Sequence, residues 1–129
     1  MVSTAEGVTA CSYFAYPDWK KAICASTHVG NKKCPEKPDY SRGYVCKLYP
    51  DYDIFSTDLQ IGLLEQLTSS PGYDAEAMVA FNGSKIIYTS MVSSDLDIWT
   101  TDLDGPNKKQ ITNNGATILD HVFFQVVIR

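Results

Sequence analysis

The sequence predicts an all-β fold, in which two four-stranded antiparallel sheets form consecutive blades of a partial β-propeller. The main observation is an internal repeat: residues 52–70 align with residues 96–114 without a gap, 44 positions apart. A strand-rich period in the low forties is typical of propeller blades. Seven of the 19 aligned pairs are identical, namely Asp53/Asp97, Ile54/Ile98, Thr57/Thr101, Asp58/Asp102, Leu59/Leu103, Gln66/Gln110 and Thr68/Thr112.

The second repeat unit contains four strand signals separated by turns. Residues 75–81 lead to Asn82–Gly83, a dipeptide that favours a two-residue hairpin because both turn positions adopt positive φ. Residues 85–90 (KIIYTS) are rich in β-branched and aromatic side chains, which suits a strand buried on both faces. Residues 96–101 alternate polar and apolar side chains. Residues 108–112 form a polar outer edge with lysines, which discourages pairing with other chains.

The first unit repeats this pattern around a long insertion. Tyr16–Pro17–Asp18–Trp19 takes the place of Ala80–Phe81–Asn82–Gly83, and Lys21–Ser26 matches Lys85–Ser90. The insertion spans residues 27–51 and contains three prolines and two glycines, so no regular element is expected in it. A loop of this length in a compact domain is either functional or mobile.

The length of the chain bounds the number of blades. The 129 residues hold fewer than three repeat units, whereas a propeller closes with about four to eight blades. We therefore expect a piece of a larger propeller, with the first blade at about residues 11–70 and the second at about residues 75–114. A divergent tail, residues 115–129, is apolar enough to form one further strand but lacks the turn residues of another blade.

The charge balance and hydropathy exclude several classes of partner. Eleven basic and fifteen acidic residues give a net charge of −4, which argues against nucleic acid, because nucleic-acid binding needs a concentrated basic face. No stretch approaches the ~18 apolar residues that a membrane span requires. The first residues lack the basic start and apolar run of a signal peptide. The residues themselves leave the compartment open.

Cysteine and histidine spacing predicts neither a metal site nor a cofactor. The four cysteines (Cys11, Cys24, Cys34 and Cys46) form no CxxC pair, which argues against a zinc ribbon or a thioredoxin-type site. Cys24 lies in an apolar run and is expected to be a buried small hydrophobe. Cys34 and Cys46 bracket a proline-rich stretch and could form a disulfide in an oxidising compartment. The two histidines, His28 and His121, have no ligand-like spacing to them.

Catalytic chemistry has no support in the sequence. No G-x-S-x-G nucleophile elbow and no glycine-rich phosphate loop is present. Carboxylates are frequent, but Asp53, Asp58, Asp97 and Asp102 recur at the repeat period. Aspartates at such positions are expected to bind backbone N–H groups in tight turns. The sequence therefore predicts no catalytic residues and no enzymatic activity.

Two groups of residues are candidates for binding a protein partner. Tyr40, Arg42 and Tyr44 lie in the insertion, and tyrosine and arginine on a loop held by a rigid sheet are typical of recognition surfaces. Tyr73, Asp74 and Glu76 lie in the connection between the blades, which leads towards the mouth of a propeller channel. Carboxylates there could bind a cation or a basic group of a partner. The alternative for both groups is packing over their own blades.

The repeated segments resemble the TolB-type, WD-like propeller repeat, whose blade reads S-P-D-G-K-K-I-A-F-T-S, then D-I-Y, D-L-D-G and L-T. Asp53–Ile54–Phe55 and Asp97–Ile98–Trp99 match its third strand. Asp102–Leu103–Asp104–Gly105 and Gln110–Ile111–Thr112 match the end of its blade. The resemblance covers about residues 12–114.

The resemblance implies a non-enzymatic scaffold or interaction module with a protein partner. It is compatible with a periplasmic or secreted location but leaves the compartment open. The alternative is the N-terminal propeller of a prolyl-oligopeptidase or dipeptidyl-peptidase-type serine hydrolase, without its catalytic domain. A nucleophile elbow encoded downstream would favour the peptidase, and further repeats without one would favour the scaffold.

Overall fold

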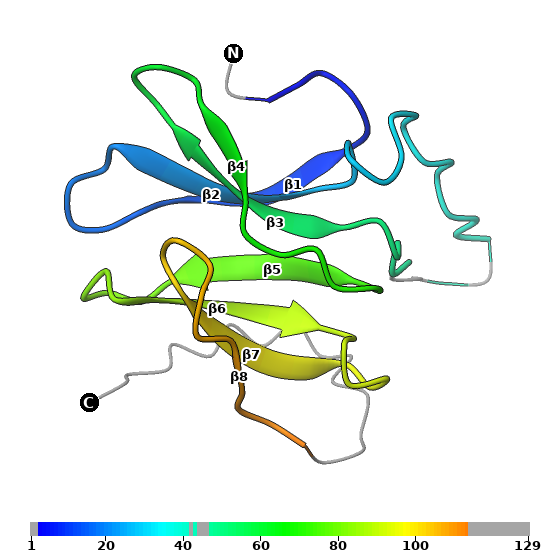
Figure 1. Ribbon diagram of the computed structural model, residues 1–129. Helices are drawn as coiled ribbons and strands as arrows, with labels where there is room; N and C mark the ends of the chain where they lie inside the picture. Colours follow the sequence, from blue (N-terminus) through cyan, green and yellow to red (C-terminus); the bar gives the residue numbers. More distant parts are fainter. Residues whose placement is uncertain (1–2, 42, 44–46, 114–129) are drawn as a thin grey trace.

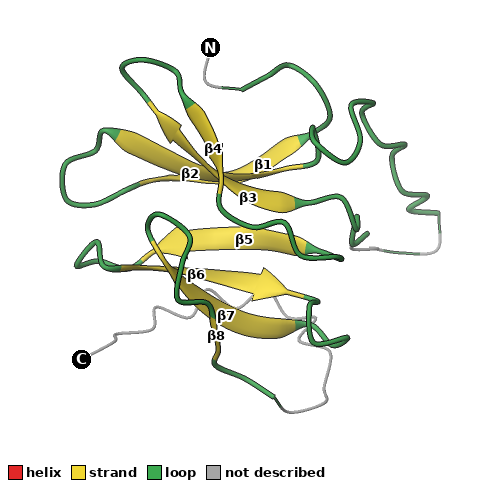
Figure 2. Ribbon diagram, viewed as in Figure 1, coloured by secondary structure: helices red, strands yellow, loops and turns green. Residues whose placement is uncertain are grey.

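The computed structural model describes residues 3–41, 43 and 47–113. In this part of the chain, strands are the only regular secondary structure, and turns and loops connect them. They form two four-stranded antiparallel sheets, in the orders β1-β2-β3-β4 and β5-β6-β7-β8 (Figures 1 and 2). This confirms the predicted all-β class and the two predicted blades, whereas the predicted tail strand at residues 115–129 lies outside the described residues. The strands are β1 (Thr9–Phe14), β2 (Lys21–Ser26), β3 (Asp53–Asp58), β4 (Leu64–Gln66), β5 (Asp74–Val79), β6 (Lys85–Ser90), β7 (Asp97–Asp102) and β8 (Lys109–Gln110).

The residues that are identical in the repeat tie the outer strand of each blade to its third strand. In the first blade, Gln66 Nε2 donates to Asp53 Oδ2 at 2.9 Å, and Thr68 Oγ1 accepts from the Ile54 backbone N–H at 2.9 Å. The same two hydrogen bonds recur in the second blade at 2.8 and 2.9 Å, between Gln110 and Asp97 and between Thr112 and Ile98. These positions therefore repeat because each blade needs the same internal bonds.

The turn between β5 and β6 differs from the predicted two-residue hairpin. The backbone N–H of Ala80 bonds to the carbonyl of Lys85 at 2.8 Å, so four residues form the loop. Gly83 has φ 70, but Asn82 is not at positive φ. Instead, Asn82 Oδ1 accepts from the Ser84 N–H at 3.1 Å and from its hydroxyl at 2.7 Å. The asparagine thus closes the turn through its side chain, and only one position needs left-handed backbone.

The hydrophobic core lies between the two sheets, because β5 packs across β1, β2 and β3 of the first blade. The β5–β6 turn also approaches the β1–β2 turn so closely that there is no room for a side chain at Gly83. A Cβ on Gly83 would lie 2.4 Å from the carbonyl oxygen of Tyr16. The buried hydrophobic cluster draws on both blades; it comprises Ile23, Ala25, Tyr52, Ile54, Leu67, Tyr73, Ala75, Ala77, Ile86, Tyr88 and Leu96.

Burial of the second strand differs between the blades. The prediction that residues 85–90 are buried on both faces is wrong, because buried and partly buried residues alternate along β6. The matching strand β2 is buried from Ala22 to Ser26. The difference follows from position, since β5 of the second blade lies against β2. Strand propensity alone therefore does not reveal how many faces are covered.

The insertion at residues 27–51 contains no strand in its described part. Its start is fixed to the N-terminal segment. The backbone N–H of Val8 donates to Thr27 Oγ1 at 3.1 Å, and that of Gly7 to the carbonyl of Lys32 at 2.7 Å. Later in the insertion, the Tyr49 hydroxyl donates to the carbonyl of Glu36 at 3.1 Å. The insertion extends from the side of the blades opposite the β1–β2 and β5–β6 turns (Figure 1).

Candidate functional site

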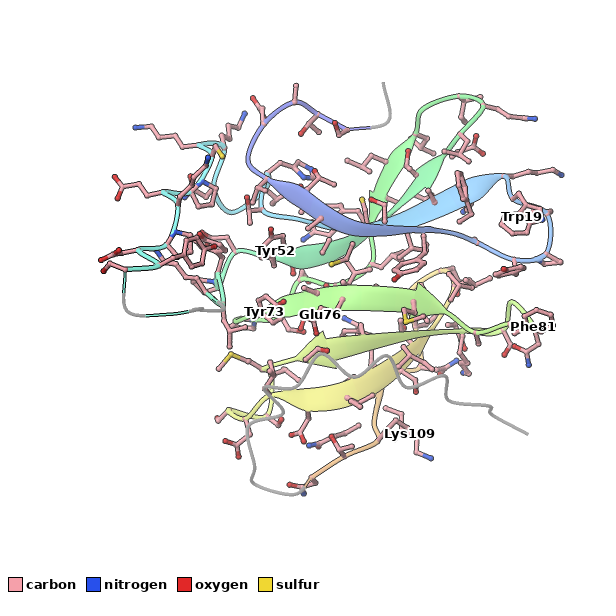
Figure 3. All side chains as sticks on the ribbon, turned by 180° about the vertical axis from the view of Figure 1, so that it is seen from behind. Trp19, Tyr52, Tyr73, Glu76, Phe81 and Lys109 are labelled. Carbon is pink, nitrogen blue, oxygen red and sulfur yellow. The ribbon has the colours of Figure 1, made fainter. Side chains whose placement is uncertain are left out.

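The predicted partner residues of the blade connection are mostly buried. Tyr73 is 7% exposed and Asp74 is 1% exposed, so neither side chain offers a surface to another protein. Glu76 is partly exposed and lies within β5. Figure 3 shows Tyr73 and Glu76 near Tyr52, at the same end of the sheets. In the structure the first two residues hold the junction between the blades, and a partner-binding role for the three stays a prediction.

Glu76 lies at a β-bulge with left-handed backbone. The pairing of β5 with β6 shifts register at this point, and Glu76 has φ 57. Its Oε2 accepts a hydrogen bond from Thr89 Oγ1 at 3.0 Å. The first strand of the other blade has the same feature, a register shift in β1 with Cys11 at φ 51. Bulges with non-glycine residues at positive φ are often found near functional sites, and here they re-aim one side chain from each blade.

The Glu76 carboxylate acts electrostatically on the Cys11 thiol. Burial raises the pKa of the Cys11 thiol, and the Glu76 carboxylate raises it further, against a smaller opposing effect of the Glu76 backbone. The reactive form of cysteine is the thiolate. Cys11 is therefore held as a thiol at neutral pH, which does not suit a catalytic nucleophile.

A row of three tyrosines connects the insertion to the blade junction. The ring centroids of Tyr49 and Tyr52 are 6.1 Å apart, and those of Tyr52 and Tyr73 are 5.8 Å apart with edge-on geometry. Lys47 Nζ lies 5.2 Å from the centroid of the Tyr49 ring. Desolvation raises the pKa of Tyr52, so its phenol stays neutral. The row packs the base of the insertion against the core.

The other predicted binding residues lie further out in the insertion. Tyr40 is 54% exposed, and its carbonyl accepts a hydrogen bond from the Gly43 N–H at 3.1 Å. Arg42 and Tyr44 lie outside the described residues. Cys34 is exposed, and Cys46 also lies outside the described residues, so the Cys34–Cys46 disulfide stays a prediction. A recognition surface in the insertion stays a prediction as well.

The duplicated aspartates have different surroundings, although the repeat predicts equal roles for them. The Asp97 carboxylate accepts hydrogen bonds from Ser93, Gln110 and Thr112 at 2.7–2.9 Å, and these bonds lower its pKa. Desolvation and the nearby negative charge of Asp74 instead raise the pKa of Asp53 to about 6. Charge is therefore disfavoured at the blade junction but well supported at the equivalent place in the second blade.

Sequence reasoning did not identify an aromatic cluster at the opposite end of the blades, formed by Phe14, Tyr16, Trp19 and Phe81. The Tyr16 ring is central, with its centroid 4.5 Å from that of Trp19 and 5.6 Å from that of Phe81. Phe14 meets Trp19 at 6.1 Å. Trp19 and Phe81 protrude from neighbouring turns in Figure 3. The exposed fractions of Phe14, Trp19 and Phe81 are 55%, 51% and 86%, so the cluster is an accessible apolar surface.

Trp19 carries a signal that could have revealed this cluster from the sequence. It replaces the glycine of the repeat and has φ 58, close to the φ 70 of Gly83 at the matching place. A bulky residue in left-handed backbone costs about 1–2 kcal/mol. The turn itself gains nothing from a large side chain at this position. A tryptophan where the repeat has glycine therefore indicates that the ring has a role outside the turn.

Among residues 3–41, 43 and 47–113, no three or more His, Cys, Asp or Glu side chains gather in a way that could hold a metal ion. His28 packs on the Phe55 ring with centroids 4.4 Å apart, and its Nδ1 lies 2.9 Å from Ser26 Oγ. The same residues contain no helix of the length and apolar character that crossing a membrane requires.

Comparison with known proteins supports the fold. No family model and no curated protein matches the sequence. Two structures described as TolB are among the solved structures that are similar. TolB from Acinetobacter baumannii matches with a TM-score of 0.58 and 20% identity, over 83% of this chain and 22% of that chain. A putative TolB from Agrobacterium tumefaciens matches with a TM-score of 0.50 and 17% identity, over 82% of this chain and 47% of that chain. The chain thus spans less than half the length of either protein, and its described part has the fold of a partial, TolB-like β-propeller.

Proposed function

We propose that this chain is a non-enzymatic interaction module that binds a protein partner through the aromatic cluster. The observation that carries the proposal is that three of its four rings are more than half exposed while the turns bearing them are fixed on rigid sheets. Aromatic side chains dominate the hot spots of protein–protein interfaces. Rings that already touch one another lose little conformational freedom on binding.

The charges around the cluster support an apolar mode of recognition. Lys20 Nζ lies 3.8 Å from Asp18, and Lys21 Nζ lies 3.4 Å from Glu65. Lys85 pairs with Asp102. With these lysines neutralised by neighbours, the surface lacks the concentrated positive charge that a nucleic acid needs. A partner would therefore bury the rings against an apolar pocket or ridge of its own.

The alternative, a peptidase propeller, gains no support from the two similar structures, since both are described as TolB. The insertion is a second candidate surface, favoured by exposed Tyr40. It extends from the other side of the blades (Figure 1), so the two candidate surfaces can be tested separately.

The test compares the binding of variants to a partner isolated by affinity capture and then purified. Trp19→Gly removes one ring and restores the residue that the turn geometry prefers, so the fold is preserved. We expect it to weaken binding by roughly tenfold or more, as for a hot-spot ring. Ile61→Ser is the matched control, because Ile61 is 74% exposed and lies outside the cluster.

Two outcomes contradict the proposal. If Trp19→Gly and Phe81→Ser leave the affinity for the purified partner unchanged, the cluster is not the interface. If Tyr40→Ala alone abolishes that binding, the insertion carries the interaction instead. Biolayer interferometry on the folded variants measures both.

A further inference from the structure

Asp74 presents an unexplained buried charge at the junction of the two blades. It is the first residue of β5 and is 1% exposed. Neither of its carboxylate oxygens accepts a well-formed hydrogen bond in the described part of the chain, and only the hydroxyls of Ser90 and Thr68 interact with it weakly as donors. Burial of an ionised carboxylate without a partner is costly, so such a group needs a proton or a counter-charge. The same position in the first blade holds Thr9, whose hydroxyl simply donates to Ser26 Oγ at 3.2 Å.

A second carboxylate lies beside it. The backbone N–H of Asp74 donates to the carbonyl of Tyr52 at 2.9 Å, which fixes the start of β5 next to the start of β3. Asp53 is the first residue of β3. The negative charge of Asp74 acts on Asp53 and raises its pKa. No described lysine or arginine forms an ion pair with either carboxylate, although the more distant Lys108 lowers both pKa values slightly.

Two hydroxyl groups complete the surroundings. Thr68 Oγ1 donates to Asp53 Oδ1 at 3.4 Å, and the Thr68 hydroxyl also favours the charged form of Asp74. Ser90 pairs directly with Asp74 across β5 and β6, and its hydroxyl acts on Asp74 in the same way. Thr68 therefore links the two carboxylates, and Ser90 lies opposite Asp74 on the neighbouring strand.

Oxygen groups of this kind are the ligands of hard divalent cations. Ca²⁺ binds carboxylate, carbonyl and water oxygens in flexible geometry, whereas Mg²⁺ demands a nearly regular octahedron. Two carboxylates also balance the charge of one divalent ion. At the matching place in the second blade, the Asp97 carboxylate accepts from three donors, and no other carboxylate contributes to the shift of its pKa. The repeat therefore does not explain why a second carboxylate, that of Asp74, lies at the junction.

We propose that the carboxylates of Asp53 and Asp74, with the hydroxyls of Thr68 and Ser90, bind a Ca²⁺-like divalent cation between the blades. Bound there, the ion joins the first blade, through Asp53 and Thr68, to the second, through Asp74 and Ser90. With only two carboxylates, the affinity belongs to the weak class, with a Kd of about 10⁻⁴–10⁻³ M.

The test titrates Ca²⁺ into chelator-treated protein and follows binding by calorimetry and thermal unfolding. We expect saturable binding and a rise in Tm, with a smaller effect of Mg²⁺. Asp74→Asn and Asp53→Asn should each weaken binding by roughly tenfold or more, because the charge of the ligand set tunes affinity. Asp97→Asn is the matched control and should leave binding intact. Ser90→Ala is a milder variant in case a junction substitution impairs folding.

The outcomes distinguish a bound cation from a proton as the group that compensates the buried Asp74 carboxylate. If wild-type protein shows no calcium binding and Asp74→Asn raises Tm at neutral pH, the buried carboxyl holds a proton and the proposal is overturned. Binding that survives Asp74→Asn also overturns it, because the ion then lies elsewhere. Partner binding through the aromatic cluster is a separate measurement, so the two proposals can fail independently.

Discussion

Trp19 occupies, in the turn between β1 and β2, the left-handed position that Gly83 occupies between β5 and β6. The two residues have φ 58 and φ 70. Glycine adopts this backbone without steric cost, whereas a side chain at the same φ is strained. The first blade thus keeps a strained turn and gains an exposed indole, which lies 4.5 Å from the Tyr16 ring.

The strain predicts a difference between two substitutions at position 19. Both Trp19→Gly and Trp19→Ala lose the ring, but only the alanine variant keeps a side chain at φ 58. We expect the glycine variant to be more stable by about 1 kcal/mol. Urea unfolding measures the difference. An alanine variant as stable as the glycine variant would show that the turn carries no strain.

The core predicts unequal costs for two phenylalanine truncations. Phe55 is 2% exposed in β3, and Phe81 is 86% exposed on a turn. Phe55→Ala should lower the free energy of unfolding by about 3–5 kcal/mol, because it leaves a cavity. Phe81→Ala should change it by about 0.5 kcal/mol or less. Chemical denaturation of both variants checks this, and similar costs would contradict the core assignment.

The junction carboxylates predict a pH dependence of stability in chelator. The pKa of Asp53 is raised from 3.8 to about 6, and that of Asp74 is raised as well. The folded chain therefore holds these protons more tightly than the unfolded chain. For Asp53 the stabilisation is complete below 3.8 and is lost as pH rises through about 6, and Asp74 changes stability in the same direction. Thermal unfolding across this window should show Tm falling with rising pH, and Asp53→Asn should flatten the slope.

Asp97→Asn is the control for that experiment. The pKa of Asp97 is lowered by its hydrogen bonds, so its stabilisation is present above the ordinary value of 3.8 and fades only at lower pH. The variant should lower Tm near neutral pH without changing the slope that Asp53 produces. An unchanged slope in Asp53→Asn would remove the basis for coupling at the junction.

The bulge residues predict a change in thiol chemistry. The Glu76 carboxylate contributes to the raised pKa of Cys11, after burial. Glu76→Gln removes that charge, so the thiolate fraction of Cys11 and its rate of alkylation by iodoacetamide should rise. Mass spectrometry of the labelled peptides measures the rate. Cys24 is the internal reference, since it is 6% exposed and should stay slow in both proteins. Equal Cys11 rates would mean that the two side chains are uncoupled.

Local patterns predicted the strands because the residues that repeat bond within their own blade. Lys21–Ser26 and Lys85–Ser90 were matched from the sequence alone and are strands with those same bounds. The hairpin at Asn82–Gly83 was predicted in the right place but with the wrong geometry. The backbone of Asn82 does not adopt positive φ, and its side chain instead accepts a hydrogen bond from the Ser84 N–H. The prediction that both faces of β6 are buried was also wrong, since burial of a face depends on whether a neighbouring blade packs against it.

By itself the sequence determined the class of fold, the two blades and the equivalence of positions such as Asp53 and Asp97, because these features rest on contacts close along the chain or repeated within a blade. Only the tertiary structure decided that the negative charge of Asp74 acts on Asp53, whereas the Asp97 carboxylate accepts hydrogen bonds from three side chains. It also decided that the rings of Tyr16 and Phe81, 65 residues apart, meet on one surface. Both results follow from the packing of β5 against the first blade, a long-range arrangement that no local pattern of residues encodes.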